Sequence, residues 1–298
     1  MALPIVVGIG EVLWDMLPGG KQLGGAPANF AYHSSALGAR GAIVSRVGDD
    51  DLGREILLRL DALGIDRTHV STDAEHPTGT VDVRLDAQGL PGYVIHQDVA
   101  WDWITPTSGM LALARRADAV CFGTLAQRTP GNACAIGEFL SATREECLRV
   151  FDVNFRQQFY NADTVLQSLA MSNVLKLNED EVPVLGSLLP RRIELRDFPA
   201  MFDLRAVALT RGPRGSVLFT KNGAFEYSGA PAEAIDTVGA GDAFTAALVM
   251  GLLANHDLDR INAAANRLAA YVCTQPGATP PIPRALVEEL YDGPGGAQ

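Results

Sequence analysis

The residues with the clearest chemical potential lie in segment 236–244, which reads Asp-Thr-Val-Gly-Ala-Gly-Asp-Ala-Phe. An apolar run continues from Ala243 to Leu253 and predicts a helix that starts within this segment. Gly239–Gly241 would form the first turn, where free backbone N–H groups and the positive end of the helix dipole favour an anion. Asp242 would then lie beside a bound phosphate and could accept a proton from a hydroxyl nucleophile. The segment therefore predicts phosphoryl transfer to an alcohol.

A glycine-rich helix start can also serve only to pack tightly against a strand, and for an isolated Gly-x-Gly-Asp that is the commoner case. Here the whole string resembles the C-terminal signature DTxGAGD of the ribokinase family of sugar kinases, also called the PfkB family, with Val238 in the variable place. The resemblance extends from Gly10 to Ala278. It implies an ATP-dependent sugar kinase in which Asp242 is the base and an anion hole is formed by Gly239, Ala240 and Gly241.

The segment Gly24-Gly25-Ala26-Pro27-Ala28-Asn29 joins an extended stretch to a predicted helix. Two glycines permit a tight turn and close approach of a ligand. The segment resembles the first family signature, GGxxxN, in which Gly24, Gly25 and Asn29 would contact the sugar. Asp15 matches the family acid that accepts hydrogen bonds from sugar hydroxyls, a role suited to carboxylates. The alternative is a simple loop-to-helix junction with Asn29 on the surface.

A third motif, Asp152-Val153-Asn154-Phe155-Arg156, follows a predicted strand. Ligands collect at the carboxyl ends of strands in α/β sheets. The motif resembles the D-x-N-x-R segment of the family, which implies a sugar contact from Asn154. Arg156 could reach the transferring phosphate, because a guanidinium fork suits phosphate oxygens. A surface arginine beside a capping asparagine is an equally good interpretation.

Two further motifs resemble nucleotide-binding segments of the family. Asn178 and Glu181 have the N-x-x-E spacing that implies contact with Mg²⁺ through water, although the same pair also suits a helix capping box. The T-x-G-x-x-G loop, which can also be a plain hairpin turn, contains Thr210, Gly212 and Gly215.

The resemblance implies three more ligand contacts. Asn266 matches a position near adenine. The family often binds a monovalent cation, usually K⁺, and Asp236 with the carbonyl of Val238 matches its ligands, aided by the loop after Cys273. Asp236 can alternatively serve only to hydrogen-bond the turn.

Short β-branched runs alternate with longer helical patterns, which predicts an α/β fold with a mostly parallel sheet. The predicted strands are Ile5–Gly10, Ala42–Val47, Ala119–Phe122, Arg149–Asp152, Val174–Leu177, Ala206–Thr210 and Ser216–Thr220. The predicted helices are Pro27–Leu37, Leu52–Leu63, Thr107–Ala114, Asn132–Glu146, Asp163–Ser172, Asp180–Leu185, Ala240–Leu253, Ile261–Cys273 and Arg284–Tyr291. The segment 211–215 is too short for a parallel crossover, so the last strands should be antiparallel. The resemblance implies a ribokinase-like three-layer α/β/α fold.

Segments 12–22 and 78–104 break the alternating pattern, because they read as extended strands around a turn at 86–89. They could form a small separate sheet, which in the family is a lid over the sugar and a common dimer contact. We therefore expect a single domain over residues 1–298, a homodimer through the lid, and a disordered tail at 293–298.

The chain carries a net charge of -11 with a pI near 4.9. This balance argues against a nucleic-acid partner, which needs clustered Lys and Arg. The four cysteines show neither zinc spacing nor a disulfide framework, and no apolar run reaches membrane-spanning length. We expect a cytoplasmic protein with reduced thiols and no membrane partner.

The acceptor is the open question. The opening 10–15, segment 23–29 and segment 99–104 together look most like bacterial fructokinases, although ribokinase and 2-keto-3-deoxygluconate kinase share most of this skeleton. A nucleoside kinase would need a base-binding slot, and a sugar-phosphate kinase would need more basic residues than Lys21 and Arg84. A catalytically silent sugar sensor is a further alternative. A dinucleotide-binding fingerprint fails because its third glycine position is Leu13.

Overall fold

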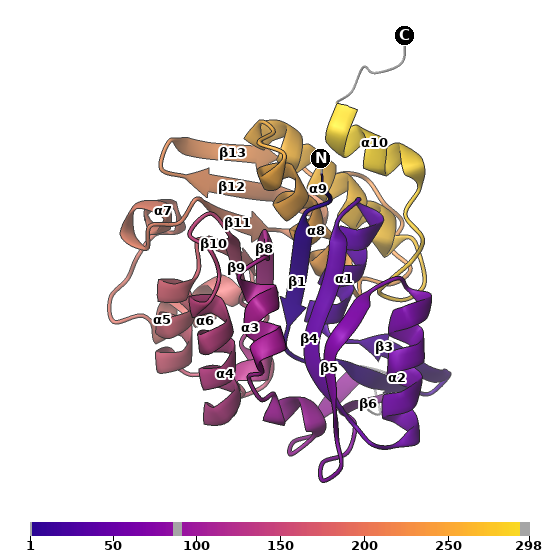
Figure 1. The fold of residues 1–298 in the computed structure, drawn as a ribbon. Coiled ribbons are helices and arrows are strands. Elements are labelled where there is room, and N and C mark those ends of the chain that lie inside the picture. Colours follow the sequence, from indigo (N-terminus) through magenta and orange to yellow (C-terminus); the bar gives the residue numbers. More distant parts are fainter. Residues whose placement is uncertain (1, 86–90, 293–298) are drawn as a thin grey trace.

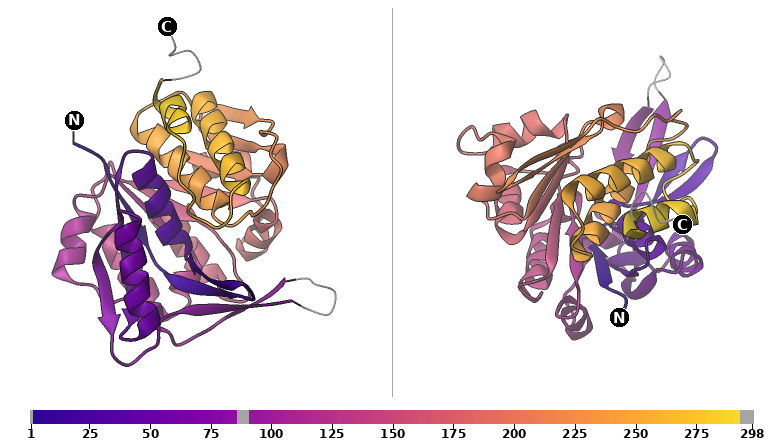
Figure 2. Two further views of the ribbon diagram at one scale, coloured as in Figure 1. Left: turned by 90° about the vertical axis from the view of Figure 1, so that its right-hand side faces the viewer. Right: turned by 90° about the horizontal axis from the view of Figure 1, so that it is seen from above.

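The computed structural model describes residues 2–85 and 91–292 of the 298-residue chain (Figure 1). The predicted turn at 86–89 and the predicted tail at 293–298 lie outside the described residues. Within them, a large sheet is covered by helices on both faces, and a small sheet stands apart from it (Figures 1 and 2). This arrangement confirms the predicted three-layer α/β/α class.

The large sheet has nine strands in the order β13-β12-β11-β10-β9-β8-β1-β4-β5. Its strands are β1 (Ile5–Ile9), β4 (Arg40–Gly48), β5 (Asp66–Asp73), β8 (Ala119–Phe122), β9 (Leu148–Asp152), β10 (Val174–Asn178), β11 (Ala206–Thr210), β12 (Ser216–Thr220) and β13 (Gly223–Tyr227). All pairs from β5 to β11 are parallel, whereas β12 and β13 add antiparallel. The predicted antiparallel end is confirmed.

Helices pack on both faces because the central strands are apolar on both sides. One face carries α3 (Ser108–Ala114), α4 (Pro130–Ser141), α5 (Ala162–Met171), α6 (Glu181–Leu188) and α7 (Phe198–Met201). The other carries α1 (Ala26–Ala36), α2 (Asp51–Ala62), α8 (Ala240–Leu253), α9 (Leu258–Cys273) and α10 (Arg284–Asp292). In β1, Val7 and Ile9 pack toward the first set, whereas Val6 packs toward the second. No helix in the described ranges is long and apolar enough to cross a membrane.

The small sheet has four strands in the order β3-β2-β6-β7 and extends to one side of the main body (Figure 2, left). Its strands are β2 (Leu13–Leu17), β3 (Gly20–Gly24), β6 (Thr80–Leu85) and β7 (Pro91–Ile95). Leu13, Val81 and Ile95 pack with the fully buried Trp101 in a separate apolar cluster. The predicted extra sheet is therefore present, formed by the two predicted segments.

Some predictions of local structure were wrong. β5 and β13 were missed, since both are edge strands with largely polar or partly exposed residues and no clear alternation. Helix α4 ends at Ser141 and not at Glu146, because its apolar face ends at Leu140 and the chain must turn before β9. Four short 3₁₀ helices, at 100–103, 125–127, 195–197 and 212–214, also complete the connections.

Candidate active site

The predicted site residues converge at one edge of the large sheet, where the parallel strands β1, β9, β10 and β11 end. Glu11 follows β1, Asp152 ends β9, Asn178 ends β10 and Thr210 ends β11. The N-termini of α1 and α8 also lie at this edge, because Asn29 of α1 contacts Asp242 of α8. The carboxyl edge of a parallel sheet is the usual place for a ligand in such folds.

Helix α8 begins as predicted, directly after Gly239. Gly239 has φ of 80°, and a Cβ there would lie 2.4 Å from the carbonyl oxygen of Ala278, so only glycine fits. In the described structure the N–H groups of Gly239 and Gly241 bond no carbonyl, while that of Ala240 bonds the Thr237 oxygen at 3.3 Å. Unpaired N–H groups at a helix start are what an anion requires.

Asp242 lies in the first turn of α8, and its Oδ2 accepts a hydrogen bond of 2.8 Å from Nδ2 of Asn29. Burial raises the pKa of Asp242 to about 6, and the neighbouring Asp152 carboxylate adds to the rise. The bond from Asn29 and the charges of Lys176 and Arg156 partly oppose it. A carboxylate with a raised pKa is a stronger base than a free aspartate.

Lys176 is a functional candidate that the sequence interpretation missed. It stands on β10 in an otherwise apolar run, is 7% exposed, and places Nζ 3.0 Å from Oδ1 of Asp152. A Cβ added to Gly241 would lie 3.2 Å from this Nζ, so the ammonium group lies directly beneath the first turn of α8. Burial lowers the pKa of Lys176, but the Asp152 and Glu181 carboxylates more than offset it, and the pKa is raised. A lysine inside an apolar strand was the signal available in the sequence.

Thr245 completes this cluster one turn further along α8. Its hydroxyl lies 3.1 Å from Oδ2 of Asp152 and 2.9 Å from the carbonyl oxygen of Gly241. Asp152 therefore contacts both Lys176 and α8, and it fixes the buried cation against the helix start.

The acceptor residues predicted from the sequence lie around the start of α1. A Cβ at Gly24 would lie 2.3 Å from Oδ2 of Asp15, and one at Gly25, where φ is 113°, would lie 2.5 Å from the Glu11 carbonyl oxygen. Both glycines are therefore needed for close packing here. Burial raises the pKa of Asp15 to about 6, and the charge of Arg156 partly opposes the rise.

Asn154 and Arg156 lie in the loop after β9. Asn154 has φ of 43°, a conformation that asparagine tolerates better than most residues. Arg156 is exposed, yet its charge lowers the pKa of both Asp15 and Asp242, so it lies near both carboxyl groups. Gln157, next in the chain, donates a bond of 2.6 Å to the carbonyl of Tyr93 and so ties the loop to the small sheet.

Asn178 and Glu181 form a reciprocal capping box at the start of α6. Glu181 Oε2 accepts from the Asn178 N–H at 2.7 Å, and Asn178 Oδ1 accepts from the Glu181 N–H at 3.0 Å. Glu181 Oε1 also accepts from the N–H of Phe155 at 3.2 Å. The structure therefore shows the capping box, and the predicted contact of Glu181 with Mg²⁺ stays a prediction.

The loop after β11 lies against the capping box, since the Glu179 N–H bonds the Thr210 carbonyl at 3.1 Å. An ion pair between Arg214 and Glu179 holds the two segments together. Gly212 and Gly215 have φ of 56° and 82°, which permits the tight turn between β11 and β12.

Two predicted ligand residues are engaged in internal hydrogen bonds. Nδ2 of Asn266 lies 2.6 Å from Oγ of Ser216 and 2.7 Å from the Asn262 carbonyl, in a buried network. Asp236 accepts from the N–H groups of Val238 and Gly277, each at 3.0 Å, so it joins the turn before α8 to the loop after α9. Their predicted contacts with adenine and a cation stay predictions.

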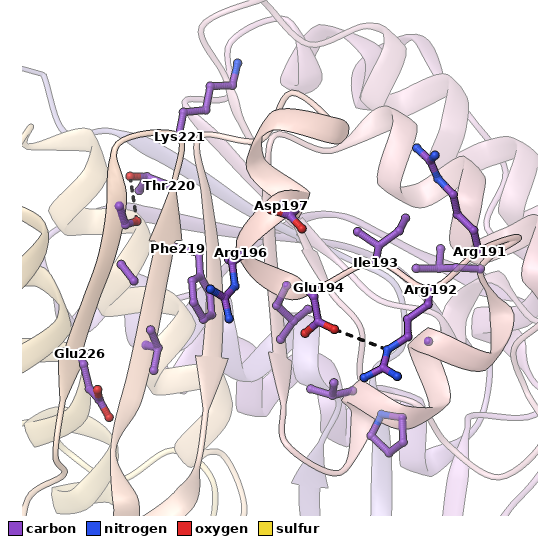
Figure 3. A pocket seen from close by; sticks show the side chains of 18 residues that line it. Arg191, Arg192, Ile193, Glu194, Arg196, Asp197, Phe219, Thr220, Lys221 and Glu226 are labelled. Atoms are coloured by element: carbon purple, nitrogen blue, oxygen red, sulfur yellow. Dashed lines mark hydrogen bonds and ion pairs between the residues drawn. The ribbon is translucent and has the colours of Figure 1, made fainter.

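A cavity of about 1130 Å³ lies elsewhere, between α6 and strands β12 and β13 (Figure 3). Arg191, Arg192, Arg196 and Lys221 line it, but Arg192 pairs with Glu194 at 3.5 Å and Lys221 with Asp203. Its lining includes none of the predicted site residues. The predicted motifs meet instead at the start of α8, where Asn29 contacts Asp242.

Known proteins resemble this chain over most of its length. A family model described as pfkB family carbohydrate kinase matches residues 18–285. The chain is similar to a fructokinase of Escherichia coli, with 27% identity over 92% of this chain and 95% of the relative.

Two solved structures share the fold. A sugar kinase of Pyrococcus horikoshii in complex with ATP has 27% identity, a TM-score of 0.79, and coverage of 92% of this chain and 94% of that chain. A fructokinase of Vibrio cholerae, in a form with fructose, ADP and calcium, has 24% identity, a TM-score of 0.78, and coverage of 97% and 98%.

Proposed function

The chain belongs to the PfkB family of carbohydrate kinases, and we propose that it transfers the γ-phosphate of ATP to a hydroxyl of D-fructose. The observation that carries this proposal is the 2.8 Å bond between Asn29 and Asp242. It joins the sugar motif to the phosphate motif, although the two residues lie 213 positions apart in the chain. The bond brings an acceptor-binding amide, a base and the free N–H groups of α8 to one place.

In the proposed reaction the sugar hydroxyl lies between Asp242 and the γ-phosphate. The hydroxyl oxygen forms a bond to phosphorus as the bond to the β-phosphate oxygen breaks, and Asp242 takes the hydroxyl proton. Because a carboxylate is still a weak base toward an alcohol, the proton moves late, when bond formation has acidified the hydroxyl. The N–H groups of Gly239 and Gly241 stabilise the phosphoryl oxygens, with Lys176 beneath them and Arg156 nearby.

The residues present are compatible with the expected cations. Both oxygens of Glu181 accept backbone N–H bonds and retain lone pairs that suit water-mediated contact with Mg²⁺. Asp236 and the carbonyl of Val238 supply the oxygen donors that a K⁺ ion takes. Mg²⁺, when bound with ATP, would neutralise charge on the β- and γ-phosphates.

The choice of fructose is supported by the similarity to fructokinases and by the state of Lys21 on the small sheet. Its Nζ pairs with Glu55 at 2.5 Å and also lies 5.1 Å above the Trp14 ring. A lysine already engaged in this way is a poor partner for a sugar phosphate. The pairing therefore favours an uncharged sugar over a phosphorylated one.

We also propose that the small sheet closes over the sugar as a lid and joins two copies of the chain. Met16, Tyr93 and Val94 expose apolar surface on this sheet, which a second copy could cover. Sedimentation should then show a dimer, and Tyr93→Glu together with Val94→Glu should yield monomers. A wild-type monomer at micromolar concentration would contradict the dimer.

The function is tested by measuring ADP release with Mg-ATP and K⁺ across fructose, ribose, 2-keto-3-deoxygluconate, fructose phosphates and adenosine. Strong turnover on fructose alone supports the proposal, and turnover on another acceptor changes the substrate only. Asp242→Asn should lower kcat by roughly 10² or more while ATP binding is kept. Near-normal turnover by this variant would refute the role of Asp242, and ATP binding without turnover on any acceptor would favour a sugar sensor.

A further inference from the structure

Two buried polar atoms at the start of α1 have no hydrogen-bond partner within the described chain. They are Oε2 of Glu11 and Oδ1 of Asn29, and their residues are 3% and 4% exposed. A buried polar atom without a partner costs roughly 1–3 kcal/mol, so proteins rarely keep one unless a ligand or water satisfies it. Two such atoms near Asp242 therefore mark a place that a ligand or an ordered water would satisfy.

The two atoms lie on the acceptor side of the site. The Glu11 carboxyl lies near the N–H of Ala26, the first residue of α1, which acts to lower its pKa. Asn29 follows three positions later, so its side chain lies near the same side of the helix start. Asn29 in turn donates to Asp242, and the charges that act on Glu11 are those of Asp242 and Arg156.

We propose that Glu11 is an acceptor-binding residue that donates a hydrogen bond from its carboxylic acid to an oxygen of a sugar hydroxyl. The inference rests on the proposed function and extends the set formed by Asp15 and Asn29. Sugar hydroxyls both donate and accept, whereas the carboxylates of Asp15 and Asp242 can only accept. A protonated Glu11 supplies a donor that these carboxylates lack.

The protonation state of Glu11 supports this role. Burial raises its pKa to about 7, and the Asp242 charge adds to the rise. Its own backbone N–H, the Ala26 N–H and the charge of Arg156 oppose it. The acid form is therefore well populated near neutral pH, and a bond donated to a sugar would raise the pKa further, so that binding takes up a proton.

The test uses the sugar with the highest turnover in the panel above, with the wild type, Glu11→Gln and Glu11→Met. Gln keeps a donor but cannot ionise, so its KM for the sugar should stay within about threefold of the wild type. Met removes the donor, so the KM for the sugar should rise about tenfold while the KM for ATP is unchanged.

Proton linkage gives a second readout that a purely structural role would not change. Calorimetry of sugar binding at pH 7.5, in buffers of different ionisation enthalpy, should show a net proton uptake by the wild type that Glu11→Gln lacks. Asp73→Asn is the matched control, since Asp73 is 2% exposed and bonds His76 and Arg46 outside the site. It should lower the thermal midpoint without changing proton uptake.

Equal proton uptake by the wild type and Glu11→Gln would overturn the inference, and so would an unchanged sugar KM in Glu11→Met. If Glu11→Met does not fold, the comparison with Glu11→Gln still decides. A wild type without turnover on any sugar would overturn the proposed function and this inference with it. Wild-type turnover with insensitive Glu11 variants would overturn this inference alone.

Discussion

Replacement of Lys176 by methionine tests what this side chain contributes to stability and what it contributes to catalysis. Lys176 and Asp152 are 7% and 4% exposed and lie 3.0 Å apart, so Lys176→Met leaves a buried carboxylate without its cation. Such a loss typically costs about 3–5 kcal/mol of the free energy of unfolding. Thr245 still donates to Asp152 and offsets part of this cost.

The expected effect on catalysis follows from the position of the Lys176 ammonium group beneath Gly241. If a phosphoryl group at the free N–H groups lies on the order of 6 Å from Nζ, one unit charge at an effective dielectric constant near 20 is worth about 3 kcal/mol. We therefore expect kcat/KM for ATP to fall by roughly 10².

The assay combines denaturant unfolding with steady-state kinetics for Lys176→Met and for Lys176→Met/Asp152→Asn. The double variant removes the unpaired charge, so it should regain most of the stability. It should regain only part of the activity, because the repulsion from Asp152 is lost but the attraction from Lys176 is not restored. Arg128→Met is the control, because Arg128 forms another buried pair, with Asp102 at 2.6 Å, in segment 99–104 and not at the start of α8. It should lose stability while kcat at saturating substrate stays within about threefold. Full recovery of both stability and activity in the double variant would refute the electrostatic role.

Three further predictions concern the start of α8. Asp242 must be ionised to act as a base, so kcat should fall as pH drops below about 6, and a profile that stays flat down to pH 5 would contradict this. Gly239→Ala places a Cβ against Ala278 at a positive φ, and the strain alone should cost about 1–3 kcal/mol of the free energy of unfolding. The unfolding midpoint and kcat should both fall, and wild-type melting and turnover would contradict this. Asp236→Asn should raise the KCl concentration needed for half-maximal rate about tenfold at constant ionic strength, and an unchanged KCl curve would argue against a cation there.

The local pattern of apolar and polar residues predicted the strands and helices that position the site. Helix α8 spans Ala240–Leu253 as predicted, because a long apolar run after a glycine turn has few alternative structures. The edge strand β5 was missed, since its polar residues form a strand only through pairing with β4. Long-range pairing is not visible in local propensity.

The same limit applies to the site: a contact between residues close in the sequence could be predicted from spacing, whereas contacts between distant residues could not. The capping box of Asn178 and Glu181 follows from spacing alone, and it was one of the two interpretations. The bond between Asn29 and Asp242 could be expected only from the family resemblance, because no spacing rule links residues 213 positions apart. The role of Lys176 depends on three elements meeting, β9, β10 and α8, and no motif in the sequence brought these together.

The acidic character of the chain is compatible with binding a nucleotide because the proposed site relies on local groups and not on the net charge of the chain. The free N–H groups of Gly239 and Gly241 carry no formal charge, and Lys176 is paired with Asp152. Burial at the start of α8 strengthens the attraction of these N–H groups for a phosphate, and it raises the pKa of Asp242 to about 6, so Asp242 is still mostly ionised near pH 7. The same burial that raises this pKa also makes the carboxylate a better base. One physical cause, exclusion of water at the start of α8, therefore serves both phosphate binding and proton transfer.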